Sequence, residues 1–186
     1  MTIVLVRHAH PVIPTVGGPD DLHRPLTEDG LADAAALAPR LAALGPARIV
    51  SSPYLRAVRT VRPAAELLGL PVETDWELRE WDSGLAPGPD YARHYASSWA
   101  NPDLVRPGGE SLRHLSDRAL GALRPLLDGP GPVVVGSHGT FISRTLAGFG
   151  YPVDWPFHRS MPMPAVYVLH FAAADAAPRV TGPGIA

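Results

Sequence analysis

The fold is decided by the stretch PVVVGSHGT, residues 132–140. Its first half is short, apolar and β-branched, which is typical of a strand that is buried on both faces in a parallel sheet. The residues after it predict a polar turn and then a helix to about Phe149. The stretch therefore forms a strand, a turn and the start of a helix, with Ser137, His138 and Gly139 at the carboxyl end of the strand.

Two other parts of the chain repeat this order of strand, polar turn and helix. The apolar residues 3–6 run into Arg7-His8, and the apolar pair 49–50 runs into Ser51-Ser52. Apolar spacing and capping residues predict helices over 28–42, 54–68, 91–99 and 110–127, with a further strand over 71–74 and a last strand over 165–171. The last strand is expected to take an antiparallel place at the sheet edge.

Strands that alternate with helices predict an α/β fold. We expect a three-layer sandwich with a mostly parallel central sheet, helices on both faces and right-handed crossovers. A chain of 186 residues is close to the size of one domain, so residues 1–186 are interpreted as a single domain. The irregular stretch 76–107, which mixes Trp, Tyr, Pro and Gly, is interpreted as an insertion that shapes a pocket over the end of the sheet.

The composition argues against several classes of protein. The formal net charge is −2 at pH 7, which disfavours a nucleic-acid partner. All 16 basic residues are Arg, so Arg and His must do any anion binding. The chain has no Cys, which rules out disulfides, thiolate metal sites and thiol nucleophiles. No apolar run reaches the roughly 18 residues of a membrane span and the start lacks a signal peptide, so we expect a cytoplasmic protein without a membrane partner.

The predicted topology gathers residues that are suited to phosphate chemistry. In parallel sheets, ligands bind beyond the carboxyl ends of the strands. Arg7, His8, Arg56 and His138 would meet at that edge, although they lie far apart in the chain. Arg binds phosphate in bidentate fashion, and a neutral imidazole can act as a nucleophile. The residues therefore predict a site where a histidine attacks a phosphoryl group.

Two other interpretations use the same histidines. His8 and His10 form a His-x-His pair of the kind that opens several metallohydrolase families, but Asp20 and Asp21 in the following loop lack a ligand spacing. We therefore expect no metal, and we place His10 in the pocket or loop without a catalytic role. Alternatively, His8 and His138 are two buried, hydrogen-bonded histidines at strand ends, with a structural role only.

Six short motifs occur in the order in which one family carries them. They are RHA at 7–9, PLTEDG at 25–30, SSPYLRAVRT at 51–60, LREWDSG at 78–84, GES at 109–111 and SHG at 137–139. Each motif is weak alone, but six at compatible spacing are specific. From residue 3 to about 170, the chain resembles the histidine phosphatase superfamily, the phosphoglycerate mutase-like proteins. It resembles the short phosphatases of that superfamily more than the mutases.

The resemblance implies a role for each matched residue. His8 would be the nucleophile and become phosphorylated, and Glu80 would be the general acid for the leaving group and then assist the attacking water. The residues implied to hold the phosphoryl group are Arg7, His8, Arg56, His138 and Gly139. No cofactor and no metal are implied. Because Arg charges surround Glu80, we expect them to lower its pKa in the free protein and a bound phosphate dianion to raise it.

The expected function is hydrolysis of a small phosphorylated metabolite through a phosphohistidine on His8. The alternatives are a phosphoprotein phosphatase that acts on phosphohistidine, a phosphoglycerate mutase-type phosphotransferase, a His-x-His metallohydrolase and a non-catalytic phosphate-binding module. The sequence does not identify the substrate, and it leaves the oligomeric state open, with a homodimer as one option. Arg59 is assigned to a solvated helix face or the pocket rim, Glu110 and Ser111 to a helix start, and His158 to a surface or structural role.

Overall fold

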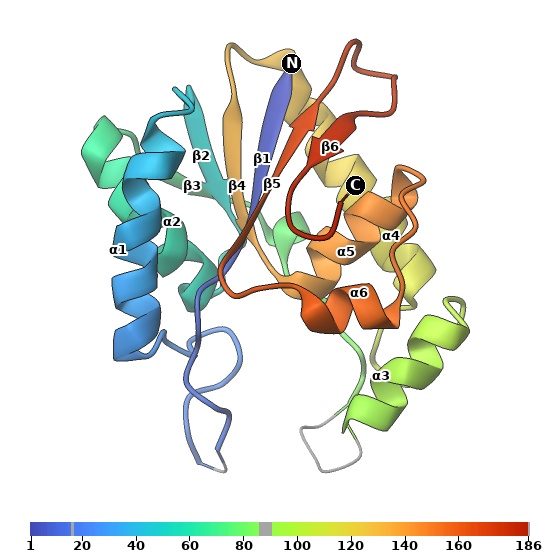
Figure 1. The fold of residues 1–186 in the computed structure, drawn as a ribbon. Coiled ribbons are helices and arrows are strands. Elements are labelled where there is room, and N and C mark those ends of the chain that lie inside the picture. The colour runs from blue at the N-terminus through green and yellow to red at the C-terminus, as the bar shows by residue number, and fades with distance from the viewer. Residues whose placement is uncertain (16, 86–90, 186) are drawn as a thin grey trace.

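A computed structural model describes residues 1–15, 17–85 and 91–185 and has the predicted α/β architecture (Figure 1). In this part of the chain, the strands form a six-stranded sheet in the order β3-β2-β4-β1-β5-β6. The strands are β1 (Thr2–Arg7), β2 (Arg48–Ser51), β3 (Val72–Thr74), β4 (Val133–Ser137), β5 (Ala165–His170) and β6 (Arg179–Thr181). The helices are α1 (Glu28–Ala42), α2 (Leu55–Leu68), α3 (Tyr91–Ala100), α4 (Leu112–Leu123), α5 (Gly139–Gly148) and α6 (Trp155–Ser160), with the 3₁₀ turns η1 (Trp76–Leu78) and η2 (Arg124–Asp128). None of the helices described is both long enough and apolar enough to cross a membrane.

The sheet is parallel from β3 to β1 and antiparallel beyond it. β1 and β2 both pair in parallel with β4, and β3 pairs in parallel with β2. β5 runs antiparallel to β1, as the sequence predicts, but it is not the edge strand, because β6 pairs with its outer side. The sequence pattern indicates neither β6 nor α6. α6 has six residues, fewer than two helical turns, so it shows no helical period, and β6 has a single buried residue, Val180.

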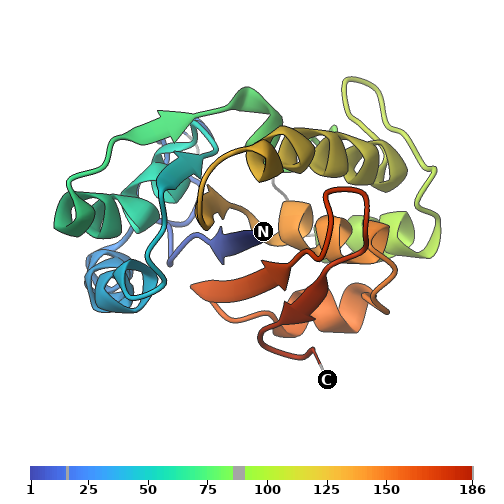
Figure 2. The same cartoon turned by 90° about the horizontal axis from the view of Figure 1, so that it is seen from above.

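The core is divided between the two faces of the sheet. Val4 and Val6 of β1 belong to a cluster with residues of α1 and α2, whereas Ile3 and Leu5 belong to a cluster with residues of α4 and α5. The division follows from strand geometry, since successive side chains point to opposite faces. In Figure 2 the two helix layers lie on opposite sides of the sheet, as expected for a three-layer sandwich.

Capping residues set the ends of the predicted helices. The side chain of Thr27 accepts a hydrogen bond from the Gly30 amide at 3.0 Å at the start of α1. The side chain of Ser111 does the same for the His114 amide, also at 3.0 Å, at the start of α4. Gly69 ends α2 with a φ of 64°, which favours glycine. These caps mark where the helices begin or end, and their buried apolar faces place α1 and α4 on opposite faces of the sheet.

The predicted insertion over 76–107 contains η1 and α3 within otherwise irregular chain. Its residues 86–90 lie outside the described residues. α3 begins at Tyr91 and ends at Ala100, close to the predicted helix. In Figure 1 this helix lies below α6, at the end of the molecule where the polar turns lie.

Candidate active site

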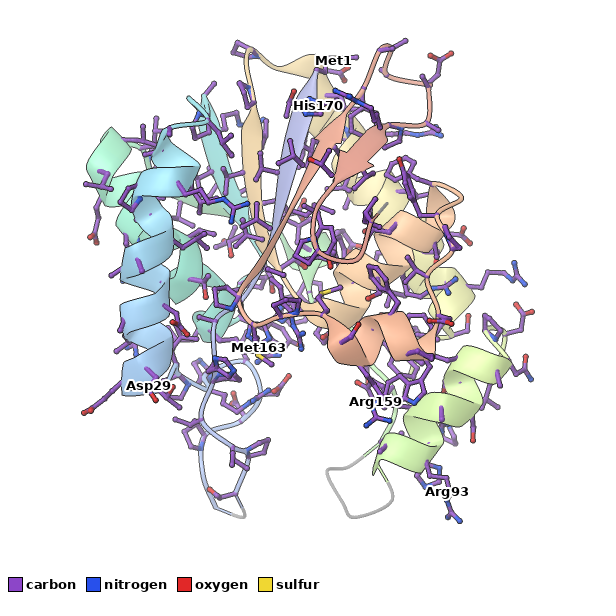
Figure 3. All side chains as sticks on the ribbon, in the orientation of Figure 1. Met1, Asp29, Arg93, Arg159, Met163 and His170 are labelled. Carbon is purple, nitrogen blue, oxygen red and sulfur yellow. The ribbon has the colours of Figure 1, made fainter. Side chains whose placement is uncertain are left out.

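The polar turns that follow three of the strands lie side by side. β2, β4 and β1 are consecutive parallel strands, so their carboxyl ends meet at one edge of the sheet. Arg7 at the end of β1 is in register with Ser137 at the end of β4. In Figure 3 this edge lies towards Met163, whereas Met1 and His170 mark the opposite end of the sheet. The convergence that the sequence predicts is therefore present in the structure.

His8 is a neutral imidazole with one nitrogen that has no hydrogen-bond partner among the described residues. The residue is 7% exposed, and its Nδ1 lies 2.8 Å from the carbonyl oxygen of Ala9. A carbonyl oxygen only accepts hydrogen bonds, so Nδ1 carries the proton and Nε2 keeps its lone pair. Burial lowers the pKa of His8 to about 3, and the charge of Arg56 acts in the same direction. At neutral pH, His8 therefore has the charge and the tautomer that a nucleophile acting through Nε2 requires.

His138 lies next to His8 and is fully buried. The centroids of the two rings are 5.3 Å apart, with their planes at 67°. Its Nε2 is 2.8 Å from the Ser52 hydroxyl oxygen, and its Nδ1 is buried without a partner among the described residues. Burial lowers the pKa of His138 well below its usual value, and Arg56 adds to the effect. The ring is neutral, and Nδ1 is the nitrogen that remains to contact a ligand.

Glu80 presents its carboxyl group to the N-terminus of α5, beside His138. Oε1 accepts hydrogen bonds from the amides of Trp81 and Phe141 at 2.9 and 3.2 Å, and Oε2 accepts one from Thr140 at 3.4 Å. Burial nevertheless raises the pKa of Glu80, because it outweighs these hydrogen bonds and the charge of Arg56. The charge of Arg56 does lower this pKa, as the sequence predicts, but the pKa is raised overall because desolvation of the carboxylate is the larger effect. A raised pKa suits a general acid.

Arg56 reaches the same edge from the first turn of α2. Its side chain is 2% exposed, and its guanidinium carbon lies 4.9 Å from the centroid of the Tyr54 ring. Nη1 donates to the backbone oxygen of Asp21 at 2.7 Å, and Nη2 donates to Oδ2 of the same residue at 3.1 Å. Arg24 donates to the other carboxylate oxygen at 2.7 Å. Burial alone would raise the pKa of Asp21, but the two guanidinium groups outweigh it and lower the pKa.

Arg7 lies between the end of β1 and the start of α5. Its Nη1 donates to the carbonyl oxygens of Met161 and Pro162, while its Nε is buried without a partner among the described residues. A Cβ atom at position 139 would lie 3.1 Å from that Nε. Gly139 therefore leaves space beside the guanidinium that any other residue would narrow.

The structure brings the predicted site residues to one place. They are Arg7, His8, Arg56, Glu80, His138 and Gly139. The links between them are the contact of the two imidazoles, the bonds from α5 to Glu80 and the effect of Arg56 on the pKa values of both histidines. The arrangement offers a nucleophile, two cations and an acid within one buried cluster.

His10 and Arg59 are outside this cluster. The His10 ring is 55% exposed and lies 3.5 Å from the Asp33 carboxylate on α1. Arg59 is half-buried on α2. Within the residues that the structure describes, no group of three or more His, Asp or Glu side chains could hold a metal ion.

Several side chains around the site were not predicted to belong to it. Asp21 and Arg24 reach Arg56 only because the loop before α1 folds back over the sheet edge, and nothing in the local sequence indicates that path. The sequence pattern does place Ser52 at this edge, directly after β2, but it does not indicate the contact of Ser52 with His138. Tyr54, which precedes α2, also contacts His138, and its position close to a strand end was a usable signal.

His158 is packed more closely than a surface role implies. It is half-buried, its Nδ1 lies 3.1 Å from the Ser143 hydroxyl oxygen, and burial lowers its pKa to about 4. Its ring stacks on Trp155 with centroids 5.5 Å apart and lies 5.3 Å from the Trp99 ring. Trp99 comes from the insertion, so these aromatic contacts hold α3 against α6.

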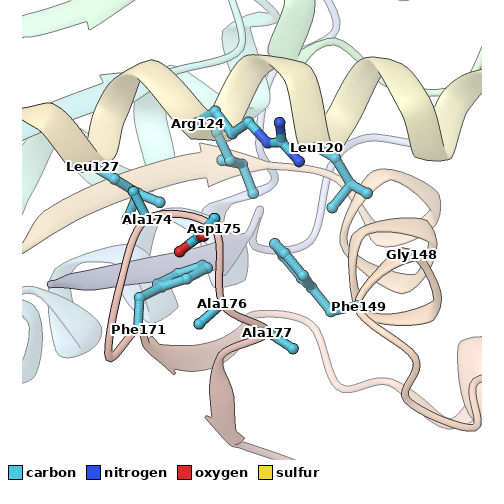
Figure 4. Close-up of a pocket in the computed structure, with 11 residues that line it drawn as sticks. Leu120, Arg124, Leu127, Gly148, Phe149, Phe171, Ala174, Asp175, Ala176 and Ala177 are labelled. Carbon is cyan, nitrogen blue, oxygen red and sulfur yellow. The ribbon is translucent and has the colours of Figure 1, made fainter.

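A pocket of about 210 Å³ lies elsewhere in the molecule (Figure 4). Leu120, Arg124, Phe149 and Phe171 are among the residues that line it. Phe171 directly follows β5, whose last residues pair with the first residues of β1. The pocket is therefore at the amino ends of the parallel strands, opposite the candidate active site, and takes no part in it.

Comparison with known proteins supports the same family at the level of sequence. Residues 3–181 match the family described as the histidine phosphatase superfamily (branch 1). Over 126 residues, the chain is 36% identical to the probable phosphoglycerate mutase GpmB of Cronobacter sakazakii, which covers 62% of this chain and 58% of that protein. The chain thus spans less than two thirds of the length of the curated relatives that it matches.

Solved structures are similar over nearly the whole chain. The mycobacterial glucosyl-3-phosphoglycerate phosphatase Rv2419c has a TM-score of 0.76 at 25% identity and covers 97% of this chain and 96% of its own. YhfR of Bacillus stearothermophilus has a TM-score of 0.77 at 26% identity and covers 100% of this chain and 97% of its own. The sheet and its helix layers are thus shared with these proteins.

Proposed function

The chain belongs to the histidine phosphatase superfamily (branch 1), and we propose that it hydrolyses phosphate monoesters of small metabolites through a phosphohistidine on His8. The observation that carries the proposal is the state of His8, which is buried and neutral with Nε2 free. A curated relative is named a probable phosphoglycerate mutase and a structural relative a glucosyl-3-phosphoglycerate phosphatase. Esters of phosphoglycerate type are therefore the first substrates to test.

In the first step, the His8 Nε2 lone pair forms a bond to phosphorus while the bond from phosphorus to the ester oxygen breaks. Arg7 and Arg56 neutralise the phosphoryl oxygens, which is where charge must be held in the transition state. If the Ser52 hydroxyl donates to Nε2 of His138, then Nδ1 of that ring carries a proton and donates to a phosphoryl oxygen. Glu80 gives its proton to the ester oxygen, so an alcohol leaves instead of an alkoxide.

In the second step, water attacks the phosphorus of the phosphohistidine. The Glu80 carboxylate accepts a proton from that water, and the phosphorus–nitrogen bond breaks. Inorganic phosphate leaves, and the Nε2 lone pair returns to His8. Glu80 thereby regains the proton that it gave to the leaving group, and His8 is neutral again.

Hydrolysis and phosphotransfer differ only in the acceptor of the second step. Water gives inorganic phosphate, whereas the free hydroxyl of a phosphoglycerate molecule gives a bisphosphate. That bisphosphate returns its other phosphoryl group to His8 and leaves as the rearranged phosphoester. We propose water as the acceptor. With 3-phosphoglycerate as substrate, release of inorganic phosphate in excess of 2-phosphoglycerate would agree with this proposal, and the reverse ratio would establish a mutase.

The nucleophile is tested by trapping the intermediate. The protein is mixed with an ester that carries labelled phosphate and quenched in alkali, where phosphohistidine survives, and the label is mapped to a peptide. We expect label on His8, no effect of EDTA, and a loss of kcat of about 10⁴-fold or more in His8→Ala. His170→Ala, an exposed histidine at the other end of the sheet, is the matched control. Sensitivity to EDTA, or turnover that survives in His8→Ala, would contradict the proposal.

A further inference from the structure

The segment that carries Glu80 has no regular structure of its own after η1 ends at Leu78. Three of its carbonyl oxygens accept hydrogen bonds from one side chain, Arg118 of α4. Nη1 of Arg118 donates to Glu77 at 2.6 Å and to Arg79 at 3.1 Å, and Nη2 donates to Glu80 at 3.4 Å. One guanidinium group thus fixes the main chain at Glu80 and at residues that precede it.

Arg118 is in turn fixed by Glu110, the middle residue of the GES motif. Its Nε donates to Glu110 Oε2 at 3.1 Å and its Nη2 to Oε1, and the two side chains are only 4% and 8% exposed. The main chain of Glu110 also holds the part of the segment that follows Glu80. The Trp81 indole donates to the Glu110 carbonyl at 2.8 Å, and the Glu110 amide donates to the Asp82 carbonyl at 2.8 Å.

The pair also borders the element that receives the Glu80 carboxyl group. The guanidinium carbon of Arg118 lies 5.9 Å from the centroid of the Phe141 ring in the first turn of α5. The amide of Phe141 donates to Glu80 Oε1. The pair therefore contacts both the main chain that carries the carboxyl group and the helix turn against which that group is placed.

Stability alone gives little reason to bury such a pair. The cost of desolvating two charges commonly cancels their attraction. A protein with apolar residues of the same size in place of the pair is therefore often just as stable. Apolar residues would not, however, satisfy three carbonyl oxygens and an amide of an irregular segment. The specific consequence of this ion pair is the fixed path of residues 77–82.

We propose that Glu110 and Arg118 are positioning residues that hold the Glu80 carboxyl group in place to protonate the leaving group. The inference rests on the proposed function of Glu80 and goes beyond it, because neither residue touches the reacting atoms. A general acid matters most when the leaving group is a poor one. Loss of the pair should therefore slow the hydrolysis of esters with basic leaving groups. It should have little effect on the hydrolysis of activated esters, whose leaving group needs no proton.

The test compares two substrates across a set of variants. Glycerol phosphate has a basic leaving group, and 2,4-dinitrophenyl phosphate has an activated one. We expect Arg118→Lys to lower kcat/KM for glycerol phosphate about 10- to 100-fold and for the activated ester less than about 3-fold, with Glu80→Gln showing the same contrast more strongly. The double variant Glu110→Gln/Arg118→Met removes both buried charges, so it leaves no unpaired charge to unfold the protein, and it should show the contrast too.

Arg113→Gln is the matched control, because Arg113 is on the same helix and its ion pair with Asp103 is exposed. Arg113→Gln should leave kcat/KM unchanged for both substrates. Equal losses on both substrates in the Arg118 variants would show a merely structural role and overturn the positioning proposal alone. If Glu80→Gln itself shows no contrast while the wild type hydrolyses both esters, the proposed role of Glu80 fails and the positioning proposal fails with it.

Discussion

Arg56 has an anion bound to it before any substrate arrives. The Asp21 carboxylate faces it from a loop and is itself 54% exposed, so it can turn towards solvent when another anion binds. A phosphoryl group must therefore compete with this carboxylate for the guanidinium. Asp21→Asn removes the charge, and we expect the KM for a phosphate monoester and the Ki of inorganic phosphate to fall about 3- to 10-fold, which is at most about 1.4 kcal/mol.

The neighbouring residue gives a matched control for this change. Asp20 accepts hydrogen bonds from His23 and, among the described residues, makes no ion pair with Arg56, so Asp20→Asn should leave both constants within about 2-fold of the wild type. Initial rates with and without inorganic phosphate measure both constants. A rise in KM in Asp21→Asn would mean that the carboxylate orients Arg56 for the substrate instead of competing with it.

The residues of the site could be predicted from the sequence, but their electrostatic state could be predicted only in part. Arg7, His8 and His138 follow apolar strands, so their shared edge was visible in the pattern. The neutral state of His8 was expected, and the charge of Arg56 does contribute to it. The raised pKa of Glu80 could not be predicted, because it depends on how far the fold buries the carboxyl group, which leaves no local pattern in the sequence.

At the scale of elements, the approach of α1 to the loop after β1 depends on one glycine. A Cβ atom on Gly30 would lie 2.2 Å from the carbonyl oxygen of His10, which is a backbone atom that cannot turn aside. The same oxygen accepts a hydrogen bond from the Thr27 amide at 3.0 Å, so the contact ties the start of α1 to residues just after His8. This contact gives the PLTEDG motif a physical reason for its glycine.

Gly30→Ala should therefore lower the free energy of unfolding by about 1–3 kcal/mol, because the helix and the loop must move apart. Gly121 is the control, since it also lies in a helix but a Cβ there meets nothing within 4 Å. Gly121→Ala should instead stabilise the protein by up to about 1 kcal/mol. Denaturant unfolding of both variants measures the difference, and a Gly30→Ala protein as stable as Gly121→Ala would contradict the close contact.

Elements that glycine, capping residues or apolar spacing mark were predicted, including the short strand β3, whereas α6 and β6 were not. α2 and α5 end within a residue of the expected positions, because glycine and apolar spacing mark them. α6 is held against α3 by the contact between the rings of His158 and Trp99, which lie far apart in sequence. Such contacts leave no local pattern, and the same limit applies to the path of the loop that carries Asp21.

At the scale of the whole molecule, burial of neutral histidines makes stability depend on pH. The pKa of His8 is lowered from 6.5 to about 3 on folding. Between these two pH values, the unfolded chain binds a proton on this histidine and the folded chain does not. Each such histidine therefore makes the free energy of unfolding fall as the pH drops, by up to about 1.4 kcal/mol per pH unit. His138 acts in the same direction, whereas Glu80, with its raised pKa, stabilises the folded chain at low pH and loses this contribution as the pH rises.

His8→Asn separates the contribution of His8 from the rest. Between about pH 6.5 and 4.5, we expect the free energy of unfolding of this variant to fall less steeply than that of the wild type, by about 1 kcal/mol per pH unit, because one protonation site is gone from the unfolded chain. Urea unfolding curves at several pH values give both slopes, and His170→Asn should keep the slope of the wild type because His170 is exposed. If His8→Asn also keeps that slope, His8 takes up its proton in the folded chain as readily as in the unfolded one. The imidazole would then be charged in mildly acidic solution, and its Nε2 lone pair would be lost there. Activity should in that case fall with a midpoint near pH 6.5, the ordinary pKa of histidine, instead of persisting to lower pH.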